Sequence, residues 1–360
     1  MRALILGPVK KTSPVGEWQL YPFKYYKKVL KERLGMKVRL VNAPNIKEIS
    51  DIIFSHKYDF DVLFVRPEWT DDPQQVEDVM RRIRLKLEIN KIILIDPFDQ
   101  TSSRFFQSLK YVDRLVKFIG LKDSSLYKNR YQGGSYQTDT LCRKHNISLD
   151  DWHVGSIMPD GCETKIVPGW FCVEPRIIRK IRSPLNRLKN KFTYPDKNID
   201  IFCHVSCGMR DSIEWYGVHR SAAIEELEKL GAKYKISVAA DFTGEPRIPR
   251  KEYLHQSQAS RIIFSPLGWG EVTMRAFDAI LNDSLYMQPD ASYVQIYPDI
   301  MIPYETYVPV KWDFSDVQEK CEYYLAHDQE RENIIQNARK AFNDYYESAA
   351  FVEKIAELII

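Results

Sequence analysis

The 360-residue sequence lacks a long hydrophobic run and a large excess of one charge. Its first apolar stretch, Ala3–Leu6, is far shorter than the hydrophobic region of a signal peptide, and no stretch approaches the ~20 apolar residues of a membrane span. We therefore expect a soluble, cytoplasmic protein and leave open a contact with a membrane surface. The net charge of +3 is too small to indicate a nucleic-acid partner.

Cysteine-based and nucleotide-binding signatures are also missing. None of the six cysteines belongs to a Cys-x-x-Cys pair, and Cys203, His204 and Cys207 do not have the spacing of a zinc site. Gly7 stands alone after the first apolar stretch, without the Gly-x-Gly-x-x-Gly fingerprint of a dinucleotide-binding dehydrogenase. We therefore predict reduced thiols, no bound metal and no dehydrogenase activity.

The first half of the chain alternates short β-branched runs with amphipathic segments. The run from Arg2 to Leu6 ends at Gly7-Pro8, which is typical of a buried parallel strand. The pattern predicts strands at 2–6, 37–41, 61–65, 92–95 and 111–118, helices at 23–34, 45–56 and 76–87, and a helical turn at 105–109. This alternation favours a parallel, doubly wound sheet.

The same alternation returns after a break. Residues 123–168 have no clear hydrophobic period, so we expect this region to be irregular. Residues 174–191 are rich in lysine and arginine, and we expect them to form a basic helix. Strands are then predicted at 200–205, 234–238, 261–265 and 284–287, and helices at 221–230, 251–260, 272–281, 316–326, 331–345 and 350–360. This predicts an α/β protein with domains at 1–172 and 199–345, a linker helix at 173–198 and a terminal helix at 346–360, with a ligand cleft between the domains.

The most informative stretch, 265–290, reads SPLGWGEVTMRAFDAILNDSLYMQPD. Gly268 and Gly270 lack Cβ atoms and allow a close backbone approach. We expect a helix to begin near Glu271, with Arg275 and Asp278 on the same face. A helix N-terminus suits phosphate, and this face suits sugar or ribose hydroxyls. Alternatively, Glu271 only caps the helix.

These residues resemble the C-terminal donor domain of GT-B glycosyltransferases of the glycosyl transferase family 1 type, in the branch with an exostosin-like G-W-G-E…R…[ED]-A signature. The downstream runs QPDAS, ETYVP and WDFSD, at 288–292, 305–309 and 312–316, fit the same branch. The resemblance implies two Rossmann-like domains facing a central cleft, with the C-terminal helix crossing back to the N-terminal domain. Asp278 stands where many retaining members have the second Glu of a Glu-x7-Glu pair, and Gly270 stands in place of the first, so retention and inversion both stay open.

The resemblance also implies a function. It predicts transfer of a sugar from a nucleotide-sugar donor to a hydroxyl of a glycan, lipid-linked or protein-linked acceptor, with no metal and no cofactor. An epimerase of the same fold and an inactive GT-B binding subunit are the alternatives. We expect donor binding by the glycine-rich loop, its helix and nearby cations: Gly268, Trp269, Gly270, Glu271, Arg275, Asp278, Arg210, Arg220 and Lys251.

A catalytic base is expected from the N-terminal domain, because it must reach the acceptor hydroxyl. Asp96 and Asp99 follow the predicted strand at 92–95, and Glu17 lies in the predicted loop between Gly7 and Trp18. Turn formation and helix capping are equally good explanations for the two aspartates. His153 and His219 are further candidates. Aromatic residues make up 12% of the chain, and we expect most to fill the core and some to stack on sugars.

Overall fold

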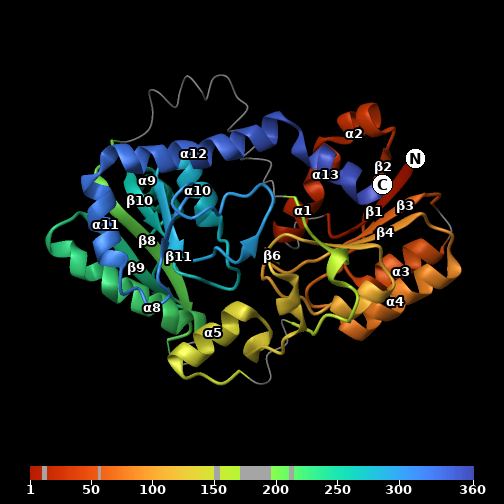
Figure 1. The fold of residues 1–360 in the computed structure, drawn as a ribbon, viewed down its shortest axis with the longest axis horizontal. Coiled ribbons are helices and arrows are strands. Elements are labelled where there is room, and N and C mark those ends of the chain that lie inside the picture. The colour runs from red at the N-terminus through yellow and green to blue at the C-terminus, as the bar shows by residue number, and fades with distance from the viewer. Residues whose placement is uncertain (10–13, 56–57, 150–154, 171–195, 211–214) are drawn as a thin grey trace.

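The computed structural model describes residues 1–9, 14–55, 58–149, 155–170, 196–210 and 215–360. Two α/β units lie side by side along the long axis of the molecule (Figure 1). Each has a parallel sheet with helices on its faces, as the alternating sequence pattern predicts. The cysteines within the described ranges, Cys142, Cys162, Cys203, Cys207 and Cys321, are free and buried, which confirms the expectation of reduced thiols for these five.

The N-terminal sheet has six parallel strands in the order β2-β1-β3-β4-β5-β7. Its centre is apolar on both faces, because residues 3–7 of β1 and all of β3 are buried. The strands are β1 (Arg2–Gly7), β2 (Lys37–Asn42), β3 (Val62–Val65), β4 (Lys91–Ile95), β5 (Arg114–Lys117) and β7 (Ile166–Pro168). The five predicted strands of this half are thus confirmed, with β5 shorter than expected.

Helices α1 (Pro14–Tyr25), α2 (Lys27–Leu34), α3 (Ile46–Phe54) and α4 (Pro73–Lys86) connect these strands. The sequence predicts one helix here, at 23–34, but the structure has two, α1 and α2. The first of them begins at Pro14, nine residues before the predicted start. Proline is well tolerated in a first helical turn, as Pro14 is here. Glu17 therefore lies on a helix, and the prediction of a loop up to Trp18 is wrong.

The region predicted to be irregular, 123–168, contains a regular helix, α5 (Tyr136–His145). Its start has a sequence signal that the prediction missed. The Ser135 side chain accepts from the Thr138 backbone N–H, and the Thr138 side chain accepts in return from the Ser135 N–H. This helix packs against α8 (Trp215–Glu228), so it belongs to the contact between the two units.

The C-terminal sheet has five parallel strands in the order β13-β11-β10-β8-β9. They are β8 (Ile199–Gly208), β9 (Ile236–Phe242), β10 (Ser260–Phe264), β11 (Leu285–Pro289) and β13 (Val308–Val310), of which the last was not predicted. With α8, the helices of this unit are α9 (Arg250–Gln258), α10 (Met274–Asn282), α11 (Val317–Ala326) and α12 (Asp328–Glu347). No helix within the described ranges is both long and apolar enough to cross a membrane.

The C-terminal helix and a short strand pair also tie the units together. The last helix, α13 (Ala350–Ile359), places Phe351 against Phe23 and Trp170, with ring centroids 5.2 and 5.1 Å apart, so the crossing back of the C-terminal helix is confirmed. Strand β6 (Gly120–Leu121) also pairs with β12 (Val294–Gln295). Most of the predicted linker helix, 173–198, lies outside the described residues, and the proposed domain limits stay a prediction.

Candidate functional site

The glycine-rich loop after β10 lies directly between the two units. A Cβ on Gly268 would come within 1.9 Å of the Arg220 Nη2, and a Cβ on Gly270 within 2.1 Å of the Asp99 carbonyl oxygen. Neither glycine has a positive φ, so close packing and not backbone conformation requires them. The close backbone approach expected at these two glycines is therefore made to Arg220, at Gly268, and to Asp99 of the N-terminal unit, at Gly270.

The same loop forms hydrogen bonds to two residues of the N-terminal unit, Thr101 and Gln137. Glu271 is fully buried, and its carboxylate accepts from Thr101, at 3.1 Å from the backbone N and 2.7 Å from the hydroxyl oxygen. The Gln137 amide of α5 donates to the Gly268 carbonyl at 2.5 Å. Burial raises the pKa of Glu271 to about 7, because the charged form loses its hydration.

Glu271 thus does not lie where the sequence analysis put it. Helix α10 begins only at Met274, and its N-cap is Thr273, whose side chain accepts from the Arg275 backbone N–H at 3.3 Å. The prediction that Glu271 opens the helix and shares a face with Arg275 is wrong. The pattern missed this because Thr273, a good N-cap residue, was read as part of the helix.

A pocket of about 270 Å³ opens beside this loop. It lies at the carboxyl ends of both sheets, where parallel α/β proteins bind ligands. The N-terminal unit contributes Trp18 after β1, Asp99 after β4 and Phe118 after β5. The C-terminal unit contributes Arg220, Gly268, Trp269, Gly270, Val272, Thr273, Met274, Arg275 and Phe277.

Two arginines of the pocket are close in space and, among the residues that the structure describes, have no carboxylate partner. Arg220 donates to the carbonyl oxygens of Ser206 and, at 3.2 Å, Leu267, and Arg275 donates to the His204 carbonyl at 2.8 Å. Within the described ranges, neither arginine forms an ion pair. Burial, together with the charge of Arg275, lowers the pKa of Arg220 to about 10. Two partly buried guanidinium groups without a counterion favour an anionic ligand.

The three predicted base candidates are in different situations. Asp99 lines the pocket, and burial raises its pKa. Asp96 is fully buried, pairs with Lys117 and accepts from Ser103 at 2.5 Å, so it does not reach the pocket. Glu17 lies on α1 next to Trp18, and its side chain is outside what the structure describes. The geometry therefore favours Asp99 and corrects the choice of Asp96.

The remaining predicted residues do not all meet at the pocket. Trp269 lines it, is 37% exposed and lies beside Trp215 and Tyr216. Arg210 pairs with Glu245 at 2.6 Å on the surface, and Lys251 is exposed in the first turn of α9. Asp278, in the middle of α10, is not among the lining residues. The expectation that Arg210, Lys251 and Asp278 lie at this pocket is thus not met.

Of the two histidine candidates, His219 is fully buried against Phe314 and His145 and is not among the residues that line the pocket. His153 lies outside the described residues. The sequence analysis gave no site role to Phe118, Thr101 or Gln137, and it included Trp18 only as the end of the predicted loop that carries Glu17. The hydrogen bonds of Thr101 and Gln137 join segments more than a hundred residues apart, and only the position of Thr101 just after the two aspartates gives a hint in the sequence.

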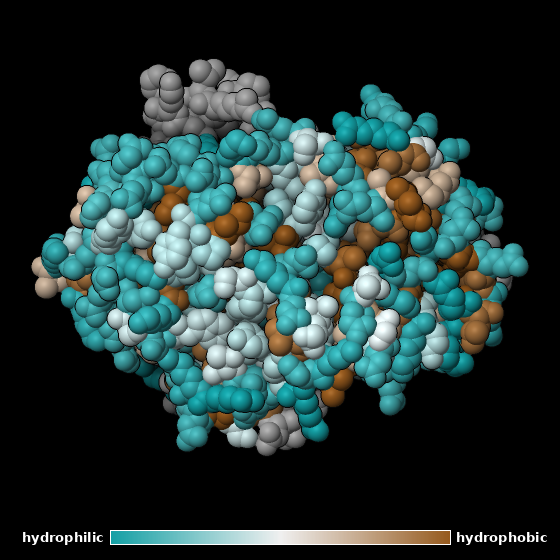
Figure 2. Space-filling model, viewed as in Figure 1, coloured by the Kyte–Doolittle hydropathy of each residue, from teal (hydrophilic) through white to brown (hydrophobic). Residues whose placement is uncertain are grey.

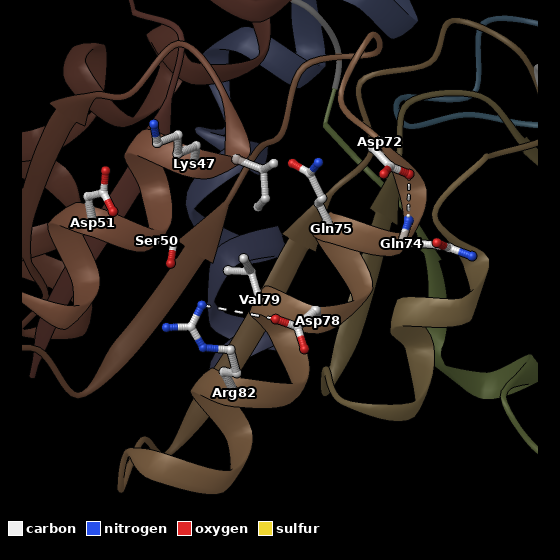
Figure 3. Close-up of a pocket in the computed structure, with 10 residues that line it drawn as sticks. Lys47, Ser50, Asp51, Asp72, Gln74, Gln75, Asp78, Val79 and Arg82 are labelled. Carbon is white, nitrogen blue, oxygen red and sulfur yellow. Dashed lines mark hydrogen bonds and ion pairs between the residues drawn. The ribbon is translucent and has the colours of Figure 1, made fainter.

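A larger groove, of about 460 Å³, lies between α3 and α4 on the N-terminal unit (Figure 3). Its polar side chains are those of Lys47, Ser50, Asp51, Asp72, Gln74, Gln75, Asp78 and Arg82, with mixed charges that partly pair with one another. It is lined by one unit only and holds none of the predicted site residues. Within the described ranges, no group of three or more His, Cys, Asp or Glu side chains is placed to hold a metal ion.

Comparison with known proteins agrees with this architecture. Residues 220–357 match the model of a family described as glycosyl transferase-like. A solved glycosyltransferase from Rickettsia africae ESF-5 is similar over 99% of this chain and 97% of its own, with a TM-score of 0.51 and 14% identity. The chain has the GT-B fold.

A second solved structure gives the same result. An E. coli structure described as "Trehalose-6-phosphate from E. coli bound with UDP-2-fluoro glucose" is similar over 100% of this chain and 99% of its own. Its TM-score is 0.52 and its identity is 11%, so the similarity establishes the GT-B fold and nothing finer. No curated protein sequence matches the chain.

Proposed function

We propose that this GT-B protein transfers a sugar from a nucleotide-sugar donor to a hydroxyl of a glycan or glycoconjugate acceptor, without a metal ion. The observation that carries the proposal is the pocket between the two sheets, which Arg220 and Arg275 line without a carboxylate partner among the described residues. A diphosphate fits such a pair of guanidinium groups. The UDP-2-fluoro glucose bound in the E. coli structure supports this choice of donor class.

In this proposal the two units supply different parts of the reaction. The acceptor oxygen attacks the anomeric carbon while the bond from that carbon to the diphosphate oxygen breaks. Asp99, from the N-terminal unit, takes the proton of the acceptor hydroxyl, a task for which its raised pKa suits it. Arg220 and Arg275 stabilise the negative charge that develops on the departing nucleoside diphosphate. The sugar would lie against Trp18, Phe118 and Trp269.

The proposal is tested by incubating the purified protein with a panel of nucleotide sugars and glycan or glycolipid acceptors. We expect release of a nucleoside diphosphate that depends on the acceptor, and a loss of at least about a hundredfold in Asp99→Asn. Asp160→Asn, at an exposed position, is the matched control. Free epimer formed without an acceptor would indicate an epimerase. Donor binding without turnover would indicate a binding subunit, and either result would overturn the proposal.

A further inference from the structure

The positive charge of this protein is concentrated at one edge of the N-terminal unit. Residues 24–39 carry seven cations and one acid, a net charge of +6, so the rest of the chain carries a net −3. We define the basic edge as these seven cations: Lys24, Lys27, Lys28, Lys31, Arg33, Lys37 and Arg39. This strong local charge has no role in the proposed sugar transfer, since none of the seven lines the pocket between the units.

All seven side chains are exposed, and they come from adjacent elements. Lys27, Lys28 and Lys31 lie on α2 at spacings of three and four residues, which places them on one side of the helix. Lys37 and Arg39 lie on β2, the edge strand of the sheet, and both point to the same face because they alternate with buried Val38. Val38 packs in the same core cluster as Leu30 of α2, so Lys37 and Arg39 point to the opposite face of the sheet, and the continuous part of the charge is the side of α2 that carries its three lysines.

Few acids neutralise this surface. Among the described residues, the ion pair formed by the seven cations is that of Lys28 with Glu32, at 3.7 Å, and Arg39 instead lies over the Tyr58 ring at 4.2 Å. Helix α13 packs against α2 and adds the exposed Glu353 and Glu357, but Glu357 pairs with Lys354 of its own helix. Most of the positive charge is thus available to an outside partner.

Apolar and aromatic side chains border the basic edge. Tyr21, Tyr25, Val29 and Leu34 on α1 and α2 are only partly buried, and Ile360 is 92% exposed. Figure 2 shows the hydrophilic surface over α2 with a hydrophobic patch next to it, towards the C-terminal end of the chain. Lysines beside partly exposed tyrosines and aliphatic residues are typical of a helix that lies in the interface of an anionic membrane.

We propose that the basic edge docks the protein on the surface of a bilayer containing anionic phospholipids. Lys27, Lys28 and Lys31 of α2 would bind the headgroup phosphates, and the bordering tyrosines and aliphatic residues would enter the boundary between headgroups and acyl chains. Docking is peripheral and needs no membrane-spanning segment. It is also independent of the proposed sugar transfer, because it uses none of the pocket residues.

The test is cosedimentation of the protein with lipid vesicles, without any nucleotide sugar. We expect binding to vesicles of phosphatidylcholine mixed with phosphatidylglycerol, weakening as salt is added, and little binding to phosphatidylcholine alone. In the triple variant Lys27→Ala, Lys28→Ala, Lys31→Ala, affinity should fall about a hundredfold, because each basic residue near the surface contributes about a fivefold factor. The matched control is Lys110→Ala, Lys235→Ala, Lys311→Ala, three exposed lysines elsewhere with the same total charge change.

Three results would overturn the proposal. The first is equal binding to neutral and anionic vesicles. The second is an equal loss of binding in both triple variants, which would show that net charge and not the basic edge matters. The third is tight binding of duplex DNA or polyphosphate with no vesicle binding, which would assign the basic edge to another polyanion. Circular dichroism of each variant checks that it is folded.

Discussion

The Glu271 carboxylate accepts two hydrogen bonds from Thr101, a residue of the other unit and 170 positions away in the sequence. Both residues are almost fully buried. Thr101 lies two residues after Asp99, so this contact ties the glycine-rich loop to the segment that carries the proposed base. We therefore assign Glu271 the role of a positioning residue, in place of the predicted contact with the donor.

This coupling across the two units can be measured directly. Glu271→Ala leaves the Thr101 N–H and hydroxyl without their acceptor inside the protein, and we expect a loss of about 1–3 kcal/mol in unfolding free energy. Because the residues act as a pair, Thr101→Val and Glu271→Ala should not be additive, with a coupling energy of about 0.5–3 kcal/mol in a double-mutant cycle. Glu305→Ala, at an exposed position, is the control. Additive single effects would contradict the pairing.

The raised pKa of Glu271 predicts a pH-dependent stability. Its pKa is about 7 in the folded protein and about 4.5 when unfolded, so the folded state binds the proton more tightly. The protonated Glu271 therefore contributes on the order of 3 kcal/mol to the unfolding free energy. This contribution is fully present below pH 4.5 and is lost as pH rises through 7.

The measurement for this prediction is urea unfolding between pH 5 and 8, comparing the natural protein with Glu271→Gln. The glutamine does not titrate, so the difference in unfolding free energy between the two proteins should change across this range. Other buried carboxyls, such as Asp96, are present in both proteins and cancel. A difference that is constant from pH 5 to 8 would refute an elevated pKa at Glu271.

Gly270 is predicted to be intolerant of any side chain. An alanine Cβ would lie 2.1 Å from the Asp99 carbonyl oxygen, and backbone atoms must move to relieve this contact. We expect Gly270→Ala to cost about 1–3 kcal/mol in stability and to lower the proposed transfer rate by displacing the Asp99 segment. In the control, Gly231→Ala, the Cβ meets only the flexible end of Ile236, at 3.2 Å. Normal activity and stability of Gly270→Ala would contradict the packing described for this loop.

The fold was predictable from the sequence because its signals are local. Runs such as residues 3–6 and 62–65 are apolar throughout, and each lies in a buried parallel strand. The errors came where local signals were weak or misread. The Ser135 capping signal before α5 was overlooked, and the short β13, with three residues, gives almost no periodic pattern.

The site was only partly predictable, for a physical reason. The G-W-G-E…R motif marked Trp269 and Arg275, which do line the pocket. Their partners come from the other unit, and a contact such as Gln137 with Gly268 has no signature in either segment. Asp96 and Asp99 are three residues apart in the segment after β4, yet one is paired with Lys117 and the other lines the pocket. Side-chain direction in such a segment depends on tertiary packing.

The central claim is that Arg220 and Arg275 bind the diphosphate of a nucleotide sugar, and isothermal titration calorimetry with a panel of nucleoside diphosphates tests it most directly. We expect at least one to bind, and Arg220→Ala or Arg275→Ala to weaken that binding by at least about tenfold, since each removes a charge-assisted contact. Arg250→Ala, at an exposed position on α9, should bind normally. Binding that is unchanged in both pocket variants, or absent for every nucleoside diphosphate, would contradict the claim.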